Sequence, residues 1–250
     1  MNTELQAIAL DEAAQTHQHA RVQQLLSTVS GWSHQVLNDA LISALEHGSL
    51  PIADELMHAG AEPQRLPPYV WVRTIEAKEE ATLAWLIRHG DPGHDDHYPL
   101  RLAASRQQWH LVRMLLPVSE AGALGSEALH NALAYGADPD LIEALCQRGA
   151  RLDEIEFKAI RLALLHQHPA AAWLFDQMTD EAWNQILAQW TLETHHDVLD
   201  ALLLMAPWPH LDAYPDRQQF PQAQARWLAH ERQRVLETQH PSSSRSRQRS

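Results

Sequence analysis

The sequence predicts an all-α solenoid of about seven helical hairpins. Three observations lead to this prediction. A pair of apolar residues recurs about every 30 residues, turn-forming residues keep fixed distances from that pair, and alternating runs rich in Val, Ile and Thr are missing. A period of this length is typical of proteins in which each repeat buries its apolar face against the next.

The apolar pair gives the repeat its register. Successive pairs are separated by 31, 30, 29, 30, 29 and 28 residues, and the last pair is the least clear. Each pair lies near the end of an amphipathic helix, which follows a shorter apolar helix and a tight turn. The pairs are Leu25-Leu26, Leu56-Met57, Leu86-Ile87, Leu115-Leu116, Leu145-Cys146, Leu174-Phe175 and Leu202-Leu203.

Glycine recurs at two places in this register. Gly60, Gly90 and Gly149 each follow an apolar pair by three residues, where a left-handed residue ends a helix. Gly48 and Gly136 lie in the turn between the two helices of a hairpin. These positions predict where each helix stops.

Proline and small residues support the same register. Pro51, Pro139 and Pro169 are placed to open the second helix, where a missing N–H is tolerated, and Asp138 is placed to cap one of these helices. Small residues on the first helix would let successive hairpins pack closely; they are Ala44, Ala103-Ala104 and Ala132.

These units resemble ankyrin repeats. Pro99-Leu100-Arg101-Leu102-Ala103-Ala104 and Leu111–Leu116 match the family pattern of T-P-L-H-x-A-A followed by an I-V-x-x-L-L helix. Ala128-Leu129-His130 and Gly149-Ala150 match further parts of it. The period is shorter than the family's 33 residues, so we expect the loops between repeats to be reduced to plain turns.

The chain divides into three parts in this interpretation. Its 250 residues suffice for one extended domain or two small ones. Residues 1–206 form the ankyrin-like repeat solenoid, with residues 1–26 as its N-terminal unit. Residues 207–240 form a C-terminal capping segment with one amphipathic helix, and residues 241–250 form a disordered basic tail.

The charge of the chain predicts the kind of partner. The net charge is −13, and without the three arginines of the last ten residues it is −16, from 16 basic and 32 acidic residues. A body of this charge repels nucleic acids and anionic membranes and attracts a basic protein surface. Solubility alone accounts for the charge equally well.

The composition also predicts a location. One cysteine, Cys146, excludes an internal disulfide and favours a reducing compartment, and the N-terminal stretch has no signal-peptide pattern. Scarce lysine with abundant Ala, Arg and Leu is typical of a bacterial protein. We expect a cytoplasmic protein, with a secreted effector that lacks a cleavable signal as the alternative.

The resemblance implies binding residues on the loop tips and on the exposed side of the first helices, which form the concave face in the family. Carried onto this chain, these positions lie in the third, fourth and fifth repeats. They are Trp71, Arg73, His94, Asp95, His97, Arg101, Ser105, Arg106 and Tyr135.

No complete catalytic site is visible in the sequence, and we expect no cofactor and no bound metal. The segment His89–Pro99 holds three histidines and three aspartates, a zinc-type set, but no fourth ligand is evident. An exposed loop between repeats explains it better. Cys146 occupies an apolar-pair position, which favours a buried core residue over a nucleophile.

Three functions remain open at this point. The first is a non-enzymatic protein-protein interaction module, for example an acidic immunity-type inhibitor of a basic toxin. The second is a secreted bacterial ankyrin-repeat effector that acts on a host protein. The third, a metal-dependent enzyme, has the least support, because function must be argued from a site.

Replacing Ala103 by a large side chain, as in Ala103→Leu, should disrupt the packing of neighbouring hairpins. Overpacking of a close contact destabilises a fold by about 1–3 kcal/mol. The melting temperature should therefore fall. An unchanged thermal unfolding curve would contradict the repeat register.

Overall fold

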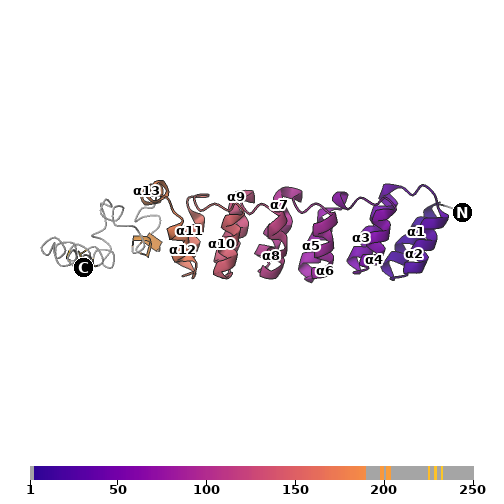
Figure 1. Ribbon diagram of the computed structural model, residues 1–250, viewed down its shortest axis with the longest axis horizontal. Coiled ribbons are helices and arrows are strands. Elements are labelled where there is room, and N and C mark those ends of the chain that lie inside the picture. The colour runs from indigo at the N-terminus through magenta and orange to yellow at the C-terminus, as the bar shows by residue number, and fades with distance from the viewer. Residues whose placement is uncertain are drawn as a thin grey trace, which may run out of the picture. The chain divides into compact units, whose positions relative to one another are not determined.

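The computed structural model describes residues 3–189, together with 198–199, 201–203, 225, 228–229 and 232. Over the described residues the chain is all-α, with thirteen α-helices and two 3-10 helices that follow one another in sequence (Figure 1). The chain separates into two compact units, residues 1–151 and 152–250. Each unit is described by itself.

The first unit consists of five helical hairpins. We call the first member of each hairpin a first helix and the second member a second helix. The first helices are α1 (Thr3–Gln15), α3 (His34–Glu46), α5 (Pro68–Ala77), α7 (His94–Ser105) and α9 (Ala123–Ala134). The second helices are α2 (His19–Thr28), α4 (Leu50–His58), α6 (Glu80–His89), α8 (Trp109–Leu115) and α10 (Pro139–Gln147). Two 3-10 helices, η1 (Pro63–Arg65) and η2 (Leu116–Val118), lie in connections between hairpins.

Helices of the same kind pack against one another in chain order. Each first helix contacts the first helix of the next hairpin, from α1 through α9, and α2 contacts α4 as α6 contacts α8. Figure 1 shows the hairpins of this unit standing side by side. Because each hairpin is covered on both sides except at the ends of the row, the apolar pairs are protected from water.

The predicted apolar pairs lie where the register places them. In the first unit the first member of every pair is buried; these residues are Leu25, Leu56, Leu86, Leu115 and Leu145. The second member is half-buried in four of the five pairs, and only Leu116 is buried. The pair lies near the end of each second helix, as predicted, except that Leu116 begins η2 directly after α8.

One turn geometry closes all five hairpins of the first unit. A single left-handed residue follows each first helix, and the next residue donates its N–H to the carbonyl five positions earlier, at 2.8–3.1 Å. This is the Schellman arrangement, which satisfies carbonyls at the helix end. The left-handed residues, 29 to 31 positions apart, are His17, Gly48, Lys78, Gln107 and Gly136.

Small side chains stand at the carbonyls that accept these turn bonds. The accepting residues are Ala13, Ala44, Thr74, Ala103 and Ala132, and all of them are buried. A larger side chain at these positions would push neighbouring first helices apart. The small residues predicted from the sequence thus lie directly beneath the turns.

The predicted ends of the second helices are partly right. Gly60 and Gly149 are left-handed, as expected, but Gly90 has a φ of −89° and does not form that cap. A Cβ added to Gly90 would come within 2.9 Å of the Leu86 carbonyl, so close approach explains this glycine.

The predicted starts of the second helices also need one correction. Pro51 and Pro139 lie in the first turns of α4 and α10, whereas Pro169 precedes α12 by two residues. Asp138 caps α10 by accepting the N–H of Leu141 at 3.0 Å, and Arg113 of the preceding hairpin donates to the same carboxylate at 2.6 Å. The Arg113 bond is the main reason that the pKa of Asp138 is lowered.

The connections between hairpins contain no strand within residues 3–189, in line with the expected plain turns. Residues 95–97 and 124–126, at the start of α7 and α9, are instead runs of three consecutive left-handed residues, and each run forms a turn before the regular part of its helix. Such residues cost about 1–2 kcal/mol each unless they are glycine. Neighbouring groups must therefore hold these turns.

The second unit contains α11 (Lys158–Leu165), α12 (Ala171–Asp176) and α13 (Asp180–Gln189). Helices α11 and α12 form a hairpin of the same kind, with Gln167 as its left-handed residue. Phe175 stacks on Trp183 with ring centroids 5.5 Å apart. Trp173 on α12 is half-buried.

The C-terminal assignments lie almost entirely outside the described residues. Of the predicted capping segment 207–240, only 225, 228–229 and 232 are described, and they are helical. The predicted basic tail 241–250 is outside the described residues altogether.

The hairpin turn predicts the effect of a substitution at Gly48. Its φ is +70° and no atom lies within 4 Å of the place that a Cβ would occupy, so only backbone conformation opposes a side chain there. Gly48→Val should lower the free energy of unfolding by about 1–2 kcal/mol, measured by urea denaturation. Gly48→Asn is the control and should lose less, because asparagine tolerates this conformation. Equal losses would contradict this explanation.

Candidate partner-binding surface

Acidic residues are concentrated on the first helices of the first unit. These five helices contain nine acidic and two basic residues, a net charge of −7, whereas the five second helices contain five acidic and three basic residues, a net charge of −2. The first helices comprise 60 residues and the second helices 45, in contrast to the expectation of a shorter first helix, and the acidic excess per residue is still more than twice as large on the first helices. The negative charge of this unit therefore lies mainly on one set of helices.

Exposed apolar side chains follow the same division. Leu5 and Ile8 lie on α1, Tyr69 on α5, Leu124 on α9, and Tyr135 directly follows α9. Within the described part of the first unit, no second helix carries an exposed large apolar residue, although Val118 on η2, directly after α8, is 40% exposed. We call the exposed side of α1, α3, α5, α7 and α9 the first-helix face.

Two of the predicted binding residues lie on the first-helix face in ion pairs. Arg73 on α5 pairs with Glu46 on α3, and Arg106 at the end of α7 pairs with Glu76 on α5 at 2.8 Å. Both arginines remain more than half exposed. They join neighbouring first helices, and such exposed pairs are worth little in stability.

Arg101 is buried, in contrast to its predicted role on the surface. Its guanidinium donates to the backbone carbonyls of Asp95 and Asp96, both at 3.1 Å, and to the Glu127 carboxylate at 2.7 Å. It also lies 5.5 Å from the ring centroid of Tyr98. Arg101 therefore holds the left-handed turn before α7 and ties α7 to α9.

Trp71 is also buried, with 2% of its surface exposed. Its position on α5 turns the ring into the core, so it offers no surface to a partner in this structure. Trp85 on α6 is buried too, and its indole N–H donates to Asp54 at 2.6 Å.

The histidine-rich segment before α7 is a structured turn. Asp95 is exposed, whereas His94 and His97 are half-buried, each with one ring nitrogen that is buried without a hydrogen-bond partner. Asp96 accepts the backbone N–H of Leu124 at 3.0 Å and so fixes the next turn. Among the described residues, no three His, Cys, Asp or Glu side chains are placed to hold a metal ion.

The last two predicted residues lie at the end of their first helices. Ser105 is half-buried and its hydroxyl donates to the carbonyl of Leu102 at 2.8 Å. Tyr135 is 51% exposed at the end of α9. Tyr135 is thus available to a partner, and Ser105 is available only in part.

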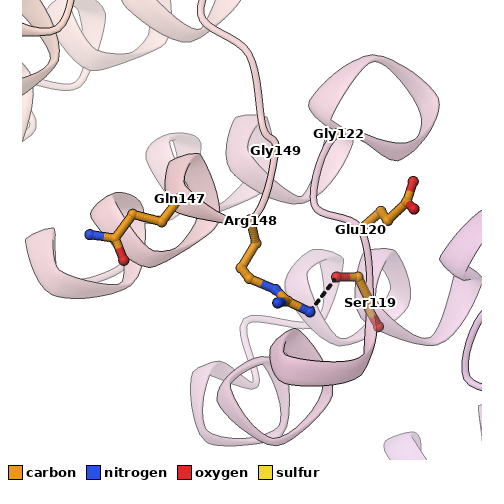
Figure 2. A pocket seen from close by; sticks show the side chains of 6 residues that line it. All are labelled: Ser119, Glu120, Gly122, Gln147, Arg148 and Gly149. Carbon is orange, nitrogen blue, oxygen red and sulfur yellow. Dashed lines mark hydrogen bonds between the residues drawn. The ribbon is translucent and has the colours of Figure 1, made fainter.

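Sequence reasoning missed an open hollow of about 470 Å³ between two connections, lined by Ser119, Glu120, Gly122, Gln147, Arg148 and Gly149. Figure 2 shows the Arg148 side chain reaching toward Ser119. Its guanidinium donates to the carbonyls of Leu116, Pro117 and Ser119. These carbonyls do not neutralise the charge of Arg148, but they occupy N–H donors of its guanidinium. Arg148 therefore holds η2 in place against the end of α10.

Cys146 does not have the properties of a nucleophile. Its side chain is half-buried on α10. Burial, followed by the nearby Glu143 carboxylate, raises the pKa of the thiol to about 11. Because the thiolate is the reactive form, this thiol is unreactive near neutral pH.

No protein-family model and no curated protein matches this chain. In the described part of the chain, no helix is both long and apolar enough to cross a membrane.

The buried position of Arg101 predicts that its loss is more damaging than the loss of an exposed arginine. Arg101→Ala removes three charge-assisted hydrogen bonds from a strained turn, so the free energy of unfolding should fall by about 2–3 kcal/mol. Arg106→Ala, the control, should lose less than about 1 kcal/mol. Urea denaturation measures both values. Equal effects would show that Arg101 does not hold the turn.

Proposed function

We propose that this chain is a non-enzymatic protein-binding module, built as an ankyrin-like solenoid, that binds a basic protein on its first-helix face. The observation that carries the proposal is the segregation of the first unit, whose first helices hold both the acidic excess and the exposed apolar side chains. An acidic immunity-type inhibitor of a basic toxin is one form of this function.

The repeated turn supports the solenoid. Five hairpins end in the same left-handed turn at intervals of 29 to 31 residues, and each first helix contacts the next one. This order of contacts is what an array of identical units requires. The resemblance in sequence to ankyrin repeats supports the same architecture.

The distribution of charge supports the choice of face. If the acidic residues served solubility alone, we would expect them to be spread over both sets of helices. They are instead concentrated on the helices that also expose Leu5, Ile8 and Tyr69. Apolar and aromatic anchors among charges are typical of protein interfaces. Arg73 and Arg106 on this face, and the buried Arg101, are already paired with glutamates, which leaves the acidic excess of the face for a partner.

Charge reversal on the two sets of helices tests the proposal. The tagged protein would be used to capture partners from its native lysate at low salt, with mass spectrometry to identify them. We expect a basic protein that is released as salt rises, because screening weakens the attraction.

The decisive comparison uses two double variants of equal charge. Glu12→Lys with Glu76→Lys alters α1 and α5 on the first-helix face and should weaken binding at least tenfold. Glu80→Lys with Asp140→Lys alters second helices α6 and α10 and should have a smaller effect. Circular dichroism would show that both variants fold. Equal weakening by both variants, or a captured protein that is not basic, would reject the proposed face.

A further inference from the structure

A column of residues runs along the first-helix face in a fixed register. Counting nine residues back from the left-handed turn residue of each hairpin gives the same place on every first helix. These residues, which we call the outer column, are Ile8, Asp39, Tyr69, Tyr98 and Glu127. Ile8, Asp39 and Tyr69 are exposed, and the other two are half-buried. Neighbours in the column lie on first helices that contact one another.

The chain uses part of this column to hold an arginine of its own. Arg101 lies 5.5 Å from the ring centroid of Tyr98 and donates to Glu127 on the next first helix at 2.7 Å. A tyrosine and an acidic residue on adjacent helices thus grip one guanidinium between them. This arrangement combines a cation–π contact with a charge-assisted hydrogen bond.

The preceding half of the column has the same two components in the opposite order, with the acidic residue on the earlier first helix and the tyrosine on the later one. Tyr69 on α5 is 48% exposed and Asp39 on α3 is exposed. Within residues 3–189, no Arg, Lys or His forms an ion pair with Asp39 and no cation stacks on Tyr69. The nearby Arg73 is instead paired with Glu46.

Electrostatics place the two components in one local environment. Burial and then the charges of Glu46 and Asp39 raise the pKa of the Tyr69 hydroxyl, while Arg73 acts in the opposite direction. Among these charges, the effects of Glu46 and Asp39 on the Tyr69 hydroxyl exceed the effect of Arg73. A cation brought to this ring would meet an attractive field.

We propose that Tyr69 and Asp39 form an anchor that binds an arginine side chain of the protein partner. The guanidinium plane would stack on the Tyr69 ring and donate to the Asp39 carboxylate, as Arg101 does with Tyr98 and Glu127. Arginine suits this anchor better than lysine, because its planar fork stacks and forms directed hydrogen bonds together. This inference rests on the proposed function and adds the chemistry of the contact.

Fluorine NMR of the full chain labelled with 3-fluorotyrosine tests the anchor directly. The chain has four tyrosines, and Tyr→Phe variants assign their signals. The probe is N-acetyl-arginine amide, and the control probe is the citrulline compound, which has a similar shape but no charge. We expect the Tyr69 signal to shift saturably with the arginine compound and the Tyr135 signal to stay in place. The citrulline compound should leave both signals unchanged.

A matched pair of variants separates the anchor from general charge. Asp39→Asn should weaken arginine binding at Tyr69 at least threefold. Asp140→Asn removes an exposed carboxylate from α10 and should leave the affinity unchanged. An unmoved Tyr69 signal, an equal response to citrulline, or equal weakening by both variants would overturn the anchor. A Tyr69 signal that depends on protein concentration without probe would identify a second copy of the chain as the occupant and also overturn it.

The two proposals fail in different ways. The anchor is rejected, and the proposed face is retained, if the variant with Glu12→Lys and Glu76→Lys loses partner capture while the Tyr69 signal does not respond to the arginine compound. The proposed function is rejected instead if the arginine compound binds at Tyr69 while the charge reversals on the first helices leave partner capture unchanged.

Discussion

The left-handed turn that closes each hairpin is the constraint on which the rest of the first unit depends. It satisfies carbonyls at the end of the first helix and reverses the chain within two residues, so the second helix starts at the same place every time. The buried alanines beneath the turns, such as Ala44 and Ala103, let the first helices of neighbouring hairpins approach closely. Regular turns and close packing together give every hairpin one common register.

Because the hairpins share one register, equivalent positions of neighbouring first helices line up in columns on the surface. Any place counted from the turn, such as that of Tyr69 and Tyr98, recurs once per hairpin along adjacent first helices. Ion pairs such as Arg73 with Glu46 also join neighbouring first helices, although each pair occupies a different place in this register. The recurring turn therefore aligns equivalent positions of neighbouring first helices, beyond its role in the packing of the core.

The sequence predicted the period, the helix pairs and several caps, because apolar spacing and the residue types of turns act locally. It missed the left-handed turns at Lys78 and Gln107, since neither residue type favours that conformation. It also placed Arg101 and Trp71 on the surface. The spacing of apolar residues predicts where a residue lies along a helix, but its burial depends on how a neighbouring hairpin covers the side chain. Arg101, for example, is covered by Glu127 of the next hairpin and by the turn at the start of α7. Tyr69 and Asp39 emerge only when positions are counted from turns that the structure reveals.

The location of charge says more about function than its total. A net charge of −13 is compatible with solubility alone. From the sequence, solubility and the attraction of a basic partner explained this charge equally well. The arrangement of the charge supports the proposed binding, because the net charge of −7 on neighbouring first helices opposes folding, and spreading the acidic residues over both sets of helices would relieve the repulsion. This excess of acidic residues lies beside exposed apolar groups such as Ile8 and Tyr69, and a basic protein surface that covered the face would neutralise it. Binding would then remove the repulsion and bury the apolar groups in the same step.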